Sequence, residues 1–151
     1  MTSLRIAVLV HSHPALKKGG GEIVAHRSFT HFREVCDHAS LFGVALPEVP
    51  GATSIFASDE RLVRYDEDEY LMSCQGYNNF LGTTSNWRLL DDIADICEAR
   101  RINVFHFHHF FQLGVNAAAY LRARFPKAAV KGGPIPGRRG GAKPGHRRQV
   151  G

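Results

Sequence analysis

The chain has 151 residues, enough for one ordinary domain, and its apolar content of 44% and charged content of 22% exclude wholesale disorder and a fibrous repeat. The net charge of +5 is uneven, because residues 1–130 carry 13 basic and 14 acidic side chains, whereas residues 131–151 carry 6 basic and no acidic ones. The basic character therefore belongs to the C-terminal tail, and we expect no specific nucleic-acid partner. Three scattered cysteines favour a reducing, cytoplasmic location, and no apolar run is long enough to span a membrane.

The residue pattern in the first half of the chain predicts a strand, a helix and a second strand, in that order. The apolar run 4–11 predicts a strand buried on both faces. Apolar residues at helical spacing predict a helix over 22–36, and the run 39–46 predicts a second strand. Proline and glycine indicate a loop over 47–58. For residues 59–84, which include an acidic run, the pattern favours helix and loop.

The second half of the chain repeats the alternation. Apolar spacing predicts a helix from Trp87, with an N-cap at Thr84 or Ser85. A strand follows at 102–107, then a helix that Pro126 ends, then a strand at 127–131. Strand, helix, strand in both halves predicts an α/β fold, a Rossmann-like doubly wound parallel sheet.

The composition predicts one domain and a tail. Residues 1–130 form the domain, and residues 131–151 form a basic tail in which 15 of the last 20 residues are Gly, Pro, Arg or Ala. Such a segment buries too little apolar surface to offset its ordering entropy, so we expect it to be disordered.

A run of three glycines, 19–21, precedes Glu22 between the first strand and the first helix. In doubly wound sheets ligands bind outside the carboxyl ends of the strands. Glycine permits close approach of a ligand to the backbone, and free N–H groups at a helix start favour an anion. The spacing is neither a dinucleotide fingerprint nor a P-loop. The alternative is a flexible turn in which Glu22 complements the helix dipole.

Two His-x-His pairs close predicted strands: His11 with His13, and His106 with His108, which His109 follows. Residues i and i+2 of a strand face the same way, so each pair is compatible with one metal ion, as in amidohydrolases. No acidic residue accompanies either pair at short range, and the chain is too short for the barrel of those enzymes. We therefore predict no metal ligand. The alternatives are hydrated histidines at the sheet edge, or a polar wall that hydrogen-bonds sugar hydroxyls or a phosphate.

Taken together, these segments resemble the N-terminal, acceptor-side domain of family 4 glycosyltransferases, which have the GT-B fold. The resemblance covers residues 4–130 and rests on GGGE at 19–22, LLDDIA at 89–94, INVFHFHH at 102–109 and LG at 113–114. It implies transfer of a sugar from a nucleotide-sugar donor to an acceptor, usually with retention and without a metal or other cofactor.

The resemblance also implies roles for residues of this chain. Gly20 and Gly21 would lie near the donor phosphates or the acceptor, and Glu22 would cap the helix. The acceptor side of the cleft would be lined by His106, His108 and His109.

The chain departs from the family after the strand residues 128–130. The family continues with a Thr-x-His motif and a donor-binding domain, whereas this sequence has Lys131-Gly132-Gly133-Pro134 and the basic tail. We expect this chain to hold only the N-terminal half and to be inactive without a donor-domain subunit. A shifted reading frame in a GC-rich gene is one hypothesis for the tail.

Three other functions stay open. These alternatives are a stand-alone Rossmann-like ligand-binding module, a histidine-based metallohydrolase, and a nucleic-acid binder that acts through the tail.

Overall fold

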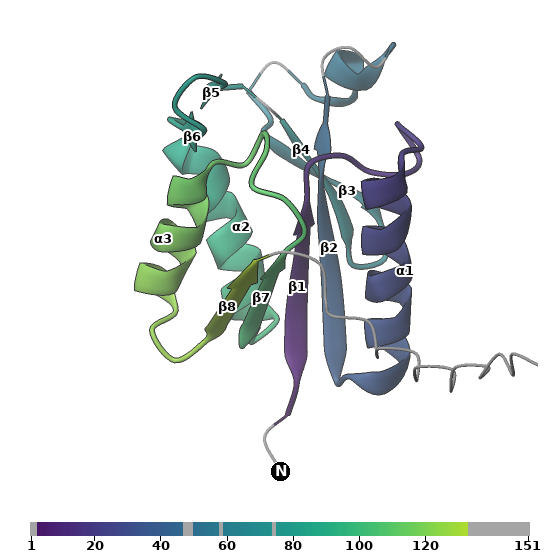
Figure 1. Ribbon diagram of the computed structural model, residues 1–151, viewed down its shortest axis with the longest axis vertical. Helices are drawn as coiled ribbons and strands as arrows, with labels where there is room; N and C mark the ends of the chain where they lie inside the picture. The colour runs from purple at the N-terminus through teal and green to yellow at the C-terminus, as the bar shows by residue number, and fades with distance from the viewer. Residues whose placement is uncertain (1–2, 47–49, 58, 74, 133–151) are drawn as a thin grey trace, which may run out of the picture.

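The computed structural model describes residues 3–46, 50–57, 59–73 and 75–132. The tail from residue 133 onward, for which we predict disorder, lies outside the described residues. Figure 1 shows a sheet covered by helices on both faces. The six-stranded sheet has the order β3-β4-β2-β1-β7-β8. All neighbouring strands pair in parallel except β3 with β4. The predicted α/β, Rossmann-like fold is confirmed.

Apart from β4, the main strands and helices lie close to their predicted positions. The strands of the parallel part are β1 (Arg5–Val10), β2 (His38–Ala45), β4 (Glu69–Ser73), β7 (Val104–Phe107) and β8 (Ala129–Gly132). The helices are α1 (Gly20–Val35), α2 (Trp87–Ala99) and α3 (Val115–Arg124), and the short 3-10 helix η1 spans Ala52–Ile55. Among the residues that the structure describes, no helix combines the length and apolarity that a membrane span requires.

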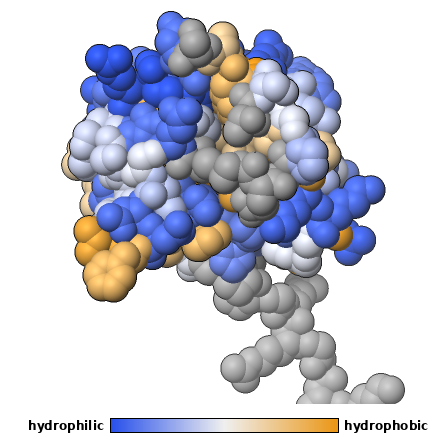
Figure 2. Space-filling model, turned by 90° about the horizontal axis from the view of Figure 1, so that it is seen from above, coloured by the Kyte–Doolittle hydropathy of each residue, from blue (hydrophilic) through white to orange (hydrophobic). Residues whose placement is uncertain are grey.

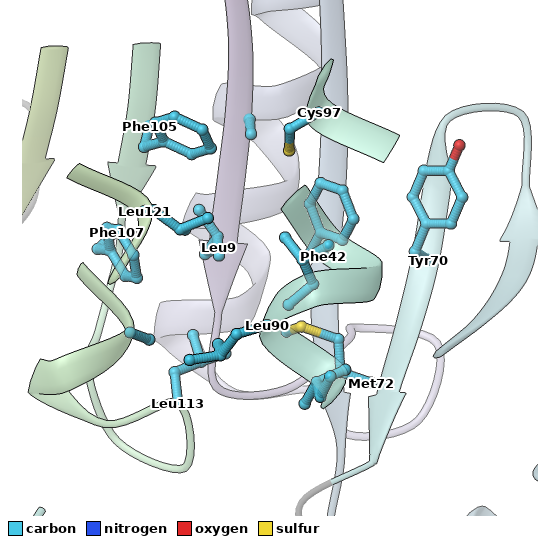
Figure 3. Close-up of a cluster of buried hydrophobic side chains, with 14 of the residues drawn as sticks. Leu9, Phe42, Tyr70, Met72, Leu90, Cys97, Phe105, Phe107, Leu113 and Leu121 are labelled. Atoms are coloured by element: carbon cyan, nitrogen blue, oxygen red, sulfur yellow. The ribbon is translucent and has the colours of Figure 1, made fainter. Parts of the chain in front are cut away.

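The central strand β1 is buried on both faces, and its side chains alternate between two hydrophobic cores. Ile6 and Val8 contact the core beneath α1, which also contains Ala25 and Phe29 of that helix. Leu9 points to the opposite face, where α2 and α3 cover a larger core. Figure 3 shows this second core, with the labelled side chains Leu9, Phe42, Tyr70, Met72, Leu90, Cys97, Phe105, Phe107, Leu113 and Leu121.

The prediction of helix and loop for residues 59–84 is wrong. The segment forms the antiparallel hairpin β3 (Leu62–Asp66) and β4, followed by the small two-stranded sheet of β5 (Tyr77–Asn78) and β6 (Thr83–Thr84). The acidic run is the hairpin turn, in which Asp68 has a left-handed φ of 57° that aspartate tolerates better than most residues. Because β4 pairs with both β2 and β3, tertiary pairing overrides the weak local strand propensity of a segment that begins with Glu69.

The N-cap of α2 is Asn86 and not Thr84 or Ser85. The Asn86 side-chain oxygen accepts a hydrogen bond from the Leu89 N–H at 3.2 Å, and the Thr84 hydroxyl oxygen instead accepts from the Asn86 N–H. Replacing Asn86 with Ala is expected to lower the free energy of unfolding by about 1 kcal/mol, because it leaves an N–H of the first turn without its acceptor. Urea denaturation measures this, and Asn86→Asp is the matched control, because it keeps the acceptor oxygen while it loses the bond from Asn86 Nδ2 to the Gln75 carbonyl. Equal losses in the two variants would contradict the assignment of the cap.

Candidate functional site

The site lies where the order of the strands reverses. The chain leaves β1 toward β2 on one side and later returns to form β7 on the other, so the carboxyl ends of β1 and β7 are neighbours. Beyond the last pair, Leu9 with Phe107, the His108 N–H donates to the Leu9 carbonyl at 2.9 Å. This is the edge at which ligands bind in open α/β sheets. Figure 2 views the molecule from above, and hydrophilic residues predominate on the coloured part of this face.

The glycine run 19–21 approaches the rings of His11 and His109 at this edge. A Cβ at Gly21 would lie 3.2 Å from His109 Nε2 and 3.4 Å from His11 Cε1, so the absence of a side chain lets the start of α1 approach both rings. The His11 and His109 rings contact each other edge to face, with centroids 4.8 Å apart. Gly20 faces open space. We call His11, Gly20, Gly21, Glu22, His108 and His109 the switch-point site.

Glu22 is the charged centre of the switch-point site. It is buried in the first turn of α1, where a carboxylate complements the helix dipole, and its Oε1 lies 2.8 Å from His11 Nε2. Its carboxylate also lies directly beside Gly19, the N-cap of the helix. Burial lowers the pKa of His11 even though Glu22 opposes that shift. A neutral His11 therefore donates Nε2–H to a carboxylate that already occupies the anion position at this helix start.

The two remaining histidines lie deeper than His109. His106 and His108 are each 5% exposed, and their rings contact edge to face at 4.9 Å. His106 points from β7 toward α1, where its ring lies 6.3 Å from that of Phe32. Neither Nε2 has a hydrogen-bond partner among the described residues. Burial lowers the pKa of His106, and burial together with neighbouring imidazoles lowers that of His108 to about 4.

The structure therefore brings most of the predicted site residues together. Gly20, Gly21 and Glu22 lie at the same edge as His109, which Gly21 approaches directly, and His108 neighbours His109 and His11 there. His106 lies one layer beneath, between β7 and α1. His11 completes the site through its contacts with Glu22 and His109.

His11 and His13 contact different carboxylates, so the two side chains do not converge on one ion position. His11 bonds to Glu22, whereas His13 Nε2 lies 2.7 Å from Oε2 of the buried Glu69. The same carboxylate oxygen lies 3.3 Å from His26 Nε2. Burial lowers the pKa of His13, although Glu69 opposes the shift. The sequence carries no signal for this second cluster, because Glu69 lies 56 residues from His13.

Two surface hollows, of about 320 and 500 Å³, have no histidine in their linings and share Asp59, Glu60 and Arg61. The first reaches Asn86 at the start of α2, and the second reaches Tyr70 of β4. Their linings mix both signs of charge, so they indicate no single class of ligand.

Comparison with known proteins finds no family model, no curated protein and no solved structure that matches this chain.

Proposed function

We propose that this chain is the acceptor-side lobe of a nucleotide-sugar-dependent glycosyltransferase and that the switch-point site binds a sugar through its hydroxyl groups. The observation that carries the proposal is the close approach of Gly21, at the start of α1, to the rings of His11 and His109 at the point where the strand order reverses. Its family-level part rests on the motif resemblance alone.

The electrostatics of the site favour hydroxyl groups over phosphate. The group at the start of α1 is the Glu22 carboxylate, which repels an anion and accepts hydrogen bonds from hydroxyls. The imidazoles of His11 and His108 favour the neutral form near pH 7, because burial lowers their pKa. A neutral imidazole offers one donor and one acceptor, which suits a hydroxyl. We therefore propose that donor phosphates bind elsewhere, on a second lobe.

Catalysis in this proposal needs that second lobe. Transfer is accelerated only by groups that stabilise the transition state more than the ground state, and such groups must surround both the donor and the acceptor. The described residues offer one side of this arrangement. The residues of this lobe are thus expected to bind a sugar by themselves and to transfer none without a donor-binding lobe.

Hydrogen exchange of the backbone amides of residues 19–22 tests the proposal. Free monosaccharides are expected to slow exchange there, and UDP, GDP or ADP without a sugar is expected to leave it unchanged. His109→Ala should weaken the protection several-fold, because it removes a hydrogen-bonding ring from the exposed side of the site, whereas His31→Ala on the outer face of α1 should not. The proposal fails if no sugar protects this segment, or if the nucleotides alone protect it.

A further inference from the structure

Three side chains from separate elements converge between α1 and the sheet. His13 comes from the loop after β1, His26 from α1 and Glu69 from the first position of β4. Oε2 of Glu69 lies 2.7 Å from Nε2 of His13 and 3.3 Å from Nε2 of His26. One ligand atom from each residue lies within 4.8 Å of the other two. We call these residues the His13–His26–Glu69 cluster.

The charge balance of the cluster is incomplete. The side chain of Glu69 is only 9% exposed, and its ion pairs within the described part of the chain are with His13 and His26. An imidazole carries no fixed positive charge at neutral pH, unlike lysine or arginine. Burying a carboxylate is costly unless a cation or several hydrogen bonds compensate its charge. A divalent cation between the three ligand atoms would supply that compensation.

We infer that the His13–His26–Glu69 cluster binds a divalent transition-metal ion of the zinc class. Two imidazole nitrogens and one carboxylate oxygen are a ligand set that zinc accepts, and they are poorly suited to magnesium or calcium, which prefer oxygen ligands alone. Three protein ligands leave the fourth tetrahedral position for water or for an oxygen of a bound molecule. The side chain of His26 is 36% exposed, which leaves the site an opening to solvent.

The ion requires a small rearrangement. Ligand atoms around tetrahedral zinc lie roughly 3.3 Å apart, so the 2.7 Å contact between His13 and Glu69 must open slightly. The His13 ring proton must also move from Nε2 to Nδ1, and Nδ1 then ceases to accept the Ala15 N–H bond of 3.2 Å. The proton shift therefore costs the structure one long hydrogen bond within the loop after β1.

The backbone around His13 keeps the ring in place. A Cβ at Gly43 of β2 would lie 2.9 Å from the His13 Cβ and 3.2 Å from its Cα and N, so the loop packs closely on the sheet at this point. The His13 ring also contacts that of Tyr65 on β3, with centroids 4.7 Å apart. The buried ligand His13 is therefore held in position before an ion arrives.

Zinc titration of the full chain against a chromophoric chelator tests the inference. The wild-type chain is expected to take one zinc ion from the chelator, and Co²⁺ in its place should show the intense visible absorption of a tetrahedral site. His26→Gln should weaken zinc binding at least tenfold. His31→Gln, on the exposed face of the same helix, is the matched control and should leave the affinity unchanged. Glu69→Gln, which keeps the shape of the side chain but removes its charge, should also weaken binding at least tenfold.

Two outcomes would overturn the inference. One is a wild-type chain that takes no zinc from the chelator. The other is zinc binding that survives His26→Gln and Glu69→Gln but is lost in His109→Gln, which would assign the ion to the switch-point site. Circular dichroism of each variant establishes that it is folded, and His26 is the most informative position because its side chain is partly exposed.

Discussion

Acidification from about pH 6.5 to about pH 4 is expected to destabilise the protein, in part through His108. Its pKa is about 4 in the folded chain, against an ordinary value of 6.5. Between these values the unfolded chain binds the proton and the folded chain does not, so the free energy of unfolding falls as the pH falls. We expect His108 to contribute about 1–2 kcal/mol, less than the full shift implies because the surrounding structure relaxes around a buried charge and admits water to it.

Urea denaturation across this pH range, with His108→Leu and His31→Leu as a matched pair, isolates the effect. The His108→Leu variant cannot bind the proton, so its stability relative to wild type should rise by about 1–2 kcal/mol as the pH is lowered from 7 to 4. His31 is exposed and should give a curve parallel to the wild type. A His108→Leu curve that is also parallel would show that burial of His108 does not oppose its protonation. Burial lowers the pKa of His11, His13 and His106 as well, so wild type should lose stability beyond the contribution of His108.

Replacing Gly114 with Ala is expected to lower the free energy of unfolding by about 3 kcal/mol or more. Gly114 is the N-cap of α3 and has φ 84° and ψ 144°, a conformation that residues with a Cβ rarely adopt. A Cβ there would also lie 2.6 Å from the Thr84 backbone N and 2.6 Å from Asn116 Oδ1. The Asn116 side chain bonds to both the N–H and the C=O of Thr84, so the clash would separate α3 from β6.

Gly82→Ala is the control that separates backbone strain from crowding. Gly82 also has a left-handed φ, 61°, but a Cβ there would meet nothing within 4 Å. The Gly82→Ala variant should therefore lose only the free energy of unfolding that the unfavourable backbone conformation costs, about 1–2 kcal/mol. Equilibrium unfolding in urea measures both variants. Equal losses at the two positions would mean that the contact between α3 and β6 yields easily and that crowding contributes little.

The two histidine clusters have different chemistry although both begin in the loop after β1. The switch-point site places a carboxylate and neutral imidazoles at an exposed edge of the sheet, which suits a ligand with hydroxyl groups. The His13–His26–Glu69 cluster lies beneath α1 and holds its carboxylate between two rings, which suits a cation. Sugar binding and zinc binding are therefore tested by different variants, and either result leaves the other open.

Local patterns in the sequence predict the elements that form the two hydrophobic cores, except β4, which contributes Tyr70 and Met72 to the larger core. Strands buried on both faces are continuous apolar runs, as in β1 and β2, and helices that cover one face show apolar residues at helical spacing, as in α2. The positions of Gly20, Gly21, His108 and His109 at one edge also follow from the sequence. Parallel strands end at the same edge, so residues after successive strands must gather there.

Only the tertiary structure determines which carboxylate each histidine meets. Strand periodicity places His11 and His13 on the same side, but the chain bends after Val10, and the two rings bond to Glu22 and Glu69 instead. Glu69 reaches His13 because β4 pairs with β2, and that pairing is set by burial of the hairpin against the sheet. The acidic run at the turn led the sequence pattern to favour helix and loop, so this hairpin is not predicted from the sequence. The order of residues in the sequence therefore determined which segments form the parallel sheet and at which edge the polar side chains gather. Long-range strand pairing determined which carboxylate each histidine contacts.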